Sequence, residues 1–253
     1  MTIEILFLFL AGITAGLVTG LFGGSATLTA VPILVVFAGY HPYVAIGVAL
    51  AVDVFSSFAA LYVYHSHNNV DIKPAIPLFS FAVIGVLIGS IFSVNIPAKG
   101  ISMLVGIGIS FASIRFINNG EVDLRCSFFN RHGHVLAAVW GFVGGLVLGV
   151  FGGGGGVVML LALTLFLGYH THTAIGTSIF GMILIALGGA AGHYYHMPFT
   201  FMAVIVGGLG GILGAIFSSR VANHLPEKWL NRIVAVVLVM LGVGLFLKGL
   251  GIY

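Results

Sequence analysis

Charged residues are scarce in this chain of 253 residues, where Asp, Glu, Lys and Arg together make up only 6%. Apolar residues make up 60%, and the mean hydropathy of +1.20 lies far above that of ordinary soluble domains. The long apolar runs lack the strict two-residue alternation of a β-barrel strand, so they predict helices. The sequence therefore predicts an all-α, polytopic protein of the cell (inner) membrane that contacts the lipid bilayer.

The scarcity of cysteine and the lack of nucleotide-binding motifs exclude further classes of protein. The single cysteine, Cys126, excludes an internal disulfide and a cysteine-rich metal cage. No nucleotide-binding fingerprint is present, which argues against ATP-driven transport, and a net charge of +3 is no sign of nucleic-acid binding. The start, Met1 to Glu4, has no Lys or Arg and no cleavage site after it, so it indicates a first membrane helix. We predict no cofactor, no metal and no nucleic-acid partner.

The hydropathy pattern predicts ten apolar segments, five on each side of a polar linker. They cover about residues 4–22, 26–39, 43–65, 75–94 and 100–117, and then about 134–151, 156–169, 172–195, 199–219 and 229–250. The second segment of each set would reach only about 21 Å as a helix, less than the roughly 30 Å of the hydrocarbon core. These two segments are predicted to be half-helices or re-entrant helices.

The two sets form an internal repeat, because adding 129 to a residue number carries the first half onto the second. Repeat 1 is assigned to residues 1–117, the linker to 118–133 and repeat 2 to 134–253. The matched pairs include Phe22-Gly23-Gly24 with Phe151-Gly152-Gly153, Gly39-Tyr40-His41 with Gly168-Tyr169-His170, and Pro97 and Lys99 with Pro226 and Lys228.

Two basic clusters indicate how the repeats are oriented. They are Arg115, Arg125 and Arg131 around the linker, and Arg220, Lys228 and Arg232 around the last loop. If the first two segments of a repeat both cross the membrane or form a re-entrant pair, both clusters lie on one side, as the positive-inside rule prefers. This favours inverted repeats over an arrangement in which the two segments form one broken span.

Glycine runs interrupt the apolar segments at Gly20–Ser25 and Gly149–Gly156. Helical glycines cost roughly 1 kcal/mol each relative to alanine, and non-helical backbone at membrane depth is tolerated only inside protein or along a wet cavity. Transporters built from two repeats hold their substrate near the midplane with such broken helices. The runs therefore indicate a substrate site.

An anion suits this site, since a glycine run before a helix offers unpaired N–H groups and the positive end of the helix dipole. Hydroxyl groups can add further donors. The glycines could instead serve close helix packing, which is the preferred interpretation for Gly12, Gly16, Gly141 and Gly145. Thr177 and Ser178 could equally bond back to helix carbonyls. The substrate-binding candidates are Gly23, Gly24, Ser25, Ala26, Thr27, Gly152, Gly153, Gly154, Gly155, Gly156, Thr177 and Ser178.

Asp53, His41 and His170 are the candidates for proton coupling. A charged Asp near the centre of a membrane helix costs about 2.5–3.5 kcal/mol on insertion scales, and the repeat counterpart of Asp53 is Met182. Asp53 could instead bond Ser56 or Ser57, or lie nearer the surface. The two histidines end the short segments, where they could also be interfacial residues or partners of the helix dipole.

Other function classes remain as alternatives. Histidine pairs such as His65-x-His67, His170-x-His172 and His193-x-x-His196 would suit a divalent metal ion permease, although no membrane carboxylates accompany them. No nucleophile stands beside a base, so an enzyme is not predicted. A passive anion pore and a secondary transporter are not distinguished, nor are a monomer and a homo-oligomer.

At Gly20–Ser25, at Val31-Pro32-Ile33-Leu34 and at Ala174–Ser178 the chain resembles the TauE/SafE family of membrane permeases, the sulfite exporters. The resemblance covers nearly the whole chain and implies transport of sulfite, sulfonates such as sulfoacetate, or related small organic or sulfur-containing anions. Two departures matter: Leu161 is the repeat counterpart of Pro32, and Asp53 lies in a segment expected to be uncharged. The substrate and the coupling ion therefore do not follow from the resemblance.

Overall fold

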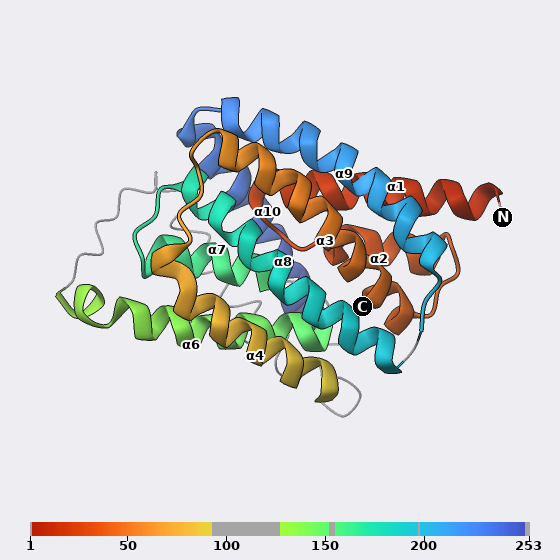
Figure 1. The fold of residues 1–253 in the computed structure, drawn as a ribbon, viewed down its shortest axis with the longest axis horizontal. Helices are drawn as coiled ribbons and strands as arrows, with labels where there is room; N and C mark the ends of the chain where they lie inside the picture. Colours follow the sequence, from red (N-terminus) through yellow and green to blue (C-terminus); the bar gives the residue numbers. More distant parts are fainter. Residues whose placement is uncertain (1, 93–126, 152–154, 197, 251–253) are drawn as a thin grey trace.

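The computed structural model describes residues 2–92, 127–151, 155–196 and 198–250, and every regular element in these ranges is helical (Figure 1). The elements are α1 (Thr2–Phe22), α2 (Thr27–Val36), α3 (Pro42–Ser66), the short 3-10 helix η1 (Lys73–Ala75), α4 (Ile76–Phe92), α6 (Ser127–Phe151), α7 (Gly155–Leu165), α8 (Thr171–His196), α9 (Phe201–His224) and α10 (Glu227–Leu250). The predicted all-α class is confirmed.

Nine predicted segments correspond to described helices, and the tenth, 100–117, lies outside the described residues. The helix ends differ by a few residues, and the largest difference is at α6, which begins at Ser127, within the predicted linker. Hydropathy marks where a helix enters lipid, whereas the helix itself can extend beyond the bilayer. The helices long and apolar enough to cross a membrane include Glu4–Phe22, Tyr43–Ser66, Lys73–Ile91, Thr171–Tyr195 and Phe201–His224, as expected of a multi-pass membrane protein.

Helix α1 packs along α9 at one edge of the bundle, and α6 packs along α4 at the other, with α3 and α8 between them (Figure 1). Gly12 meets the backbone of Gly207, and Gly16 meets that of Gly211 one turn later. Because the residue numbers of the contacts increase together along both helices, α1 and α9 run parallel. A Cβ on either α1 glycine would collide with a carbonyl oxygen of α9, so the predicted packing role of these glycines is confirmed.

The α6–α4 pair repeats this geometry. Gly141 meets Leu78 and Gly145 meets Ala82, so these helices are also parallel. Both contacts correspond to the α1–α9 contacts. Adding 129 to Gly12 and Gly16 gives Gly141 and Gly145, and subtracting 129 from Gly207 and Gly211 gives Leu78 and Ala82. The internal duplication stays a prediction, and these matching contacts support it.

Helix directions also support the inverted orientation. Helix α3 runs parallel to α9, since Val52 contacts Gly207 and Ser56 contacts Gly211. Helix α8 runs the opposite way along α3, because Gly47 near the start of α3 meets His193 near the end of α8. The repeat counterparts α3 and α8 therefore point in opposite directions through the bundle.

The short helices turn back at the glycine breaks. The rings of Phe7 in α1 and Phe37 after α2 stack with centroids 5.3 Å apart, and the Tyr40 hydroxyl donates to Glu4 Oε1 at 3.1 Å. Burial, with the adjacent Glu4 carboxylate, raises the pKa of Tyr40, so the hydroxyl keeps its proton as the donor. The end of α2 thus lies beside the start of α1, which makes α1 and α2 a re-entrant pair.

The second half turns back in the same way. The ring of Trp140 in α6 lies 6.0 Å from the ring of Phe166, just after α7. With 10 residues in α2 and 11 in α7, each short helix reaches about 15–17 Å, roughly half of the hydrocarbon core.

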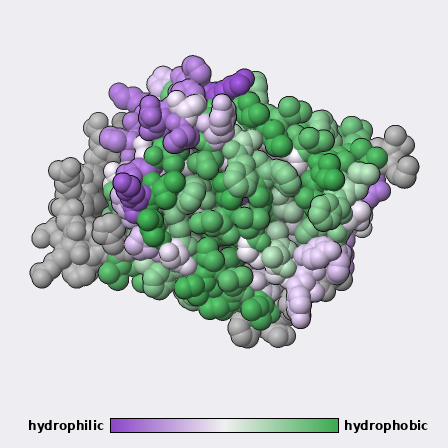
Figure 2. All heavy atoms as spheres, in the orientation of Figure 1, coloured by the Kyte–Doolittle hydropathy of each residue, from purple (hydrophilic) through white to green (hydrophobic). Residues whose placement is uncertain are grey.

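The surface suits a bilayer. Figure 2 shows a broad apolar band across the face drawn, with hydrophilic residues gathered mainly toward the end where α3 and α9 finish. Large apolar side chains such as Tyr62, Leu213 and Phe217 are more than half exposed along the membrane-spanning helices. Lipid tails cover such side chains at no cost, so their exposure is expected of membrane helices.

Candidate functional site

A buried carboxylate lies at the centre of the first half. Asp53, near the middle of α3, is fully buried and accepts hydrogen bonds from three groups. The Thr19 hydroxyl donates to Oδ1 at 2.9 Å, while the Ser25 hydroxyl and the Ala26 N–H each donate to Oδ2 at 2.9 Å. Asp53 therefore ties α3 to both sides of the first glycine break.

The glycine break gives these donors their positions. Gly23 has a φ of +66°, a left-handed conformation that glycine adopts without strain, and its N–H still bonds to the Thr19 carbonyl. The chain then reverses, and Ser25 and Thr27 place their hydroxyl oxygens 2.9 Å apart at the start of α2. The predicted residues from Gly23 to Thr27 thus form one compact turn, with the Asp53 carboxylate at the positive end of α2.

Two alternatives for Asp53 are wrong. Asp53 is fully buried and lies near the middle of the 25-residue helix α3, so it is not near the end of a membrane segment. The carboxylate accepts hydrogen bonds from α1 and the glycine turn, while Ser56 donates to the Val52 carbonyl of its own helix at 3.0 Å. The Ser57 hydroxyl has no hydrogen-bond partner among the described residues, so it does not bond Asp53 either.

The second half contributes the start of α7 and one face of α8. Gly155 and Gly156 are buried, and a Cβ on Gly156 would collide with the carbonyl oxygen of Gly23 and approach the sulfur of Met182. Ser178 lies directly against Gly23, with its hydroxyl donating to the Ile175 carbonyl at 2.8 Å. The two glycine breaks therefore meet. Gly152, Gly153 and Gly154 lie outside the described residues.

Thr177 belongs to a different environment from its neighbour Ser178. Its buried hydroxyl accepts a hydrogen bond from the Asp71 N–H at 3.0 Å, and Tyr169 donates to the Asp71 carbonyl, also at 3.0 Å. Burial, followed by the charge of Asp71, raises the pKa of Tyr169, which keeps this donor protonated. Thr177 thus fastens the loop between α3 and η1 onto α8.

His41 and His170 lie at the surface, each just before a long helix. His41 precedes α3 and accepts from the Tyr43 N–H at 3.4 Å. About 18 Å of helix separates it from Asp53. The side chain of His170 is 88% exposed, with Nδ1 3.8 Å from Glu227 Oε1. Both stand at the N-terminal ends of helices, so the interpretation as partners of a helix C-terminal dipole is wrong.

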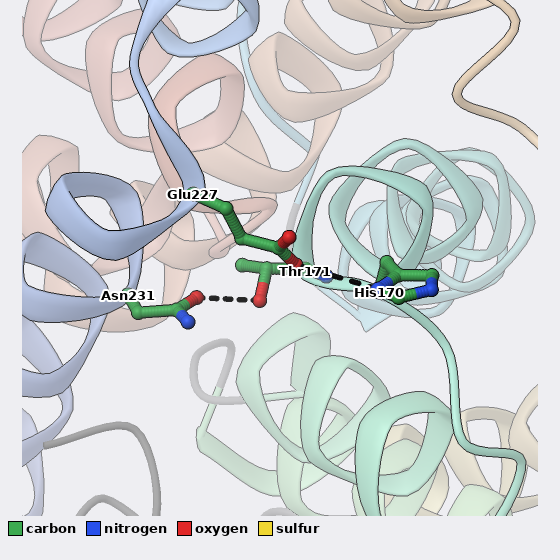
Figure 3. Close-up of polar contacts among 4 residues, drawn as sticks. All are labelled: His170, Thr171, Glu227 and Asn231. Carbon is green, nitrogen blue, oxygen red and sulfur yellow. Dashed lines mark hydrogen bonds and ion pairs between the residues drawn. The ribbon is translucent and has the colours of Figure 1, made fainter. Parts of the chain in front are cut away.

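The start of α8 is fastened to α10 beside His170 (Figure 3). Glu227 Oε1 accepts from the Thr171 N–H at 3.0 Å, and the Thr171 hydroxyl donates to the Asn231 side-chain oxygen. A carboxylate here satisfies an unpaired helix N–H and complements the helix dipole. This contact fixes α10 against the polar end of the bundle.

The histidine pairs do not assemble within the described ranges. The rings of His67 and His224 lie 5.9 Å apart at the polar end, and His193 is buried against the Tyr43 ring at 4.3 Å. In that part of the chain no three His, Cys, Asp or Glu side chains come together as metal ligands. The metal-permease alternative therefore gains no support from the described histidines.

Sequence reasoning missed Thr19 as a partner of Asp53. The signal was in the repeat alignment, where Thr19 and Asp53 have the apolar counterparts Leu148 and Met182. Two polar residues that depart together from the symmetry of a repeat are candidates for contact.

Comparison with known proteins agrees with this architecture. The family model described as "Sulfite exporter TauE/SafE" matches residues 8–245. "Probable membrane transporter protein YunE" of Bacillus subtilis is 27% identical, over 96% of this chain and 97% of its own length, and "Probable membrane transporter protein YdhB" of the same organism is 25% identical, over 91% and 94%. A "Probable membrane transporter protein" of Xylella fastidiosa is 25% identical, over 96% and 95%. No solved structure matches significantly. The chain is a multi-pass membrane transporter and belongs to the TauE/SafE sulfite exporter family.

Proposed function

We propose that the protein is a secondary transporter of small organic or sulfur-containing anions, such as sulfite, sulfonates or sulfoacetate. The observation that carries this proposal is the meeting of the two glycine breaks beside a buried, hydrogen-bonded carboxylate. Broken helices near the midplane, with N-terminal ends turned toward the break, suit an anion that must shed its water.

The two breaks are not equivalent, and this asymmetry supports a site for the anion at the second break. At the first break the Asp53 carboxylate already occupies the N-terminal end of α2. At the second break Met182 stands at the position related to Asp53 and contributes no charge. We therefore place the anion at the N-terminal end of α7, against Gly155 and Gly156, and include Gly152 to Gly154 from the sequence.

Asp53 can carry a proton without disturbing the glycine turn. The Thr19 hydroxyl lies 2.9 Å from Asp53 Oδ1 and 3.1 Å from the Ala15 carbonyl, but it has one proton to donate. When Oδ1 is ionised, Thr19 donates to it. When Oδ1 is protonated, the carboxylic acid donates to Thr19, which turns its own proton to Ala15. Oδ2 accepts from Ser25 and Ala26 in both states.

His41 and His170 are placed to exchange protons with water on the two sides. They precede α3 and α8, which run in opposite directions, so the two histidines lie at opposite ends of the bundle. The coupling we propose moves one proton through Asp53 with the anion, and the histidines act only at the surfaces.

The test is uptake of labelled anions into proteoliposomes with and without a pH gradient. A panel of sulfite, sulfoacetate, acetate and chloride separates the substrate classes. We expect sulfite or sulfoacetate to accumulate above the equilibrium level only with the gradient. Equilibration without accumulation would identify a passive pore, and no flux of any anion would overturn the proposal.

A further inference from the structure

Ser57 is fully buried, and within the described residues its hydroxyl has no hydrogen-bond partner. Buried hydroxyl groups are nearly always paired, and a helical serine normally bonds back to a carbonyl three or four residues earlier. Ser56, Ser178 and Ser219 all do so. Ser57 departs from this pattern, since its buried hydroxyl is not bonded to a carbonyl of its own helix.

The helix face of Ser57 is the face that lines the first glycine break. At 100° per residue, Ser57 lies about 40° around α3 from Asp53 and about 20° from Tyr64. Asp53 bonds the glycine turn, and the Tyr64 hydroxyl donates to the Gly20 carbonyl at 3.1 Å. Around the helix, Tyr64 lies between Asp53 and Ser57, so Ser57 borders a face whose side chains contact the end of α1 and the turn after it.

On the side of Ser57 opposite Asp53, helix α3 packs against α8. Leu50, about 20° further round α3, contacts α8, where a Cβ on Gly189 would lie 3.0 Å from Leu50 Cδ1. Ser57 therefore faces the junction of α1, α3 and α8. At that junction Gly23, Ser178 and Gly156 meet.

We propose that the Ser57 hydroxyl is a hydrogen-bond donor to the transported anion. This inference rests on the proposed function and adds a residue from α3 to the anion site. An oxyanion has several acceptor oxygens, so a hydroxyl from α3 can add a hydrogen-bond donor to those that the start of α7 offers. The repeat counterpart of Ser57 is Ala186. Like the Asp53 carboxylate, the Ser57 hydroxyl is therefore present in the first half and has no polar counterpart in the second.

The test compares Ser57→Ala with Ser56→Ala in the purified full-length protein. Ser56 is the matched control, because it is adjacent, equally buried and bonded within its own helix. The measurements are the thermal unfolding midpoint in detergent, its increase with added sulfite, sulfoacetate, acetate or chloride, and KM for flux of the anion that stabilises the wild type most.

We expect Ser57→Ala to unfold at or above the wild-type temperature and to bind the anion roughly tenfold or more weakly, as expected for loss of a hydrogen bond to a charged group. Ser56→Ala should keep the wild-type affinity. If Ser57→Ala instead loses stability and keeps its affinity, the hydroxyl serves a buried water and the assignment is overturned.

Failure of the Ser57 assignment is distinguishable from failure of the proposed function. If the wild type transports an anion with the pH gradient and Ser57→Ala does so with unchanged KM, only the Ser57 assignment falls. If no anion in the panel stabilises or crosses with the wild type, the proposed function falls and the Ser57 assignment falls with it.

Discussion

Asp53→Asn separates proton coupling from anion passage. The amide oxygen can replace Oδ2 and accept from Ser25 and Ala26, and the amide NH₂ can donate to Thr19 as the carboxylic acid would. The variant therefore resembles protonated Asp53 permanently. We expect it to exchange labelled anion across the membrane at a rate within about tenfold of the wild type, and to lose accumulation driven by a pH gradient.

The structure also gives the expected cost in stability. Asp53→Asn keeps both bonds to the turn and loses only their charge assistance, about 1 kcal/mol each, and a neutral amide is cheaper to bury than a carboxylate. The net change should stay below about 2 kcal/mol. Asp53→Ala removes the acceptor of the Ala26 N–H, at about 1–3 kcal/mol, and leaves a cavity. It should be less stable than Asp53→Asn and should lose anion exchange as well.

The assay is counterflow in proteoliposomes, measured with and without a pH gradient for both variants at matched protein density. Counterflow needs no proton driving force, so it reports anion passage alone. Accumulation of anion by Asp53→Asn to the wild-type level under the gradient would remove Asp53 from the coupling mechanism. Loss of counterflow in a variant that unfolds at the wild-type temperature would show that Asp53 binds the substrate or gates its path.

Three further predictions follow from particular contacts. Gly156→Leu should abolish transport with normal membrane insertion, because its side chain would enter the space beside the Gly23 carbonyl; normal substrate affinity in the inserted variant would contradict this. With the native cysteine replaced, single cysteines at His41 and His170 should react with a membrane-impermeant reagent from opposite faces, and labelling of both from one face would refute the opposite directions of α3 and α8. Glu227→Ala should lower the unfolding free energy by about 0.5–2 kcal/mol through loss of the α8 cap while leaving anion affinity unchanged, and an unaltered denaturation midpoint would exclude the capping role.

Much of the fold followed from the sequence. Apolar runs fix membrane helices because the bilayer permits few other structures, and a segment as short as 26–39 has too little length to cross. The first site turn was also predictable, since glycine and small polar residues between two helices imply a break. The sequence thus located both the re-entrant helices and the region where they meet.

The partners of Asp53 were not predictable from local sequence patterns, and only the comparison of the two halves pointed to Thr19. Its contacts with Thr19 and Ser25 join positions 34 and 28 residues apart, and they depend on how α1 and α3 cross. Local periodicity carries no information about such crossings. The same limit applies to Thr177 and Ser178, which are adjacent in sequence. Thr177 bonds the loop between α3 and η1, whereas Ser178 contacts the first glycine break.

The parallel pairing of α1 with α9 and of α4 with α6 has a consequence for the origin and assembly of the protein. Each half covers its outer helix with a helix of the other half, so a separately expressed half would expose a glycine-lined groove to lipid. If the two halves arose by duplication, a single-repeat ancestor would have had to associate as an antiparallel dimer, which requires insertion in both orientations. Two co-expressed halves with opposite flanking charges should therefore complement each other, whereas two copies of one orientation should not.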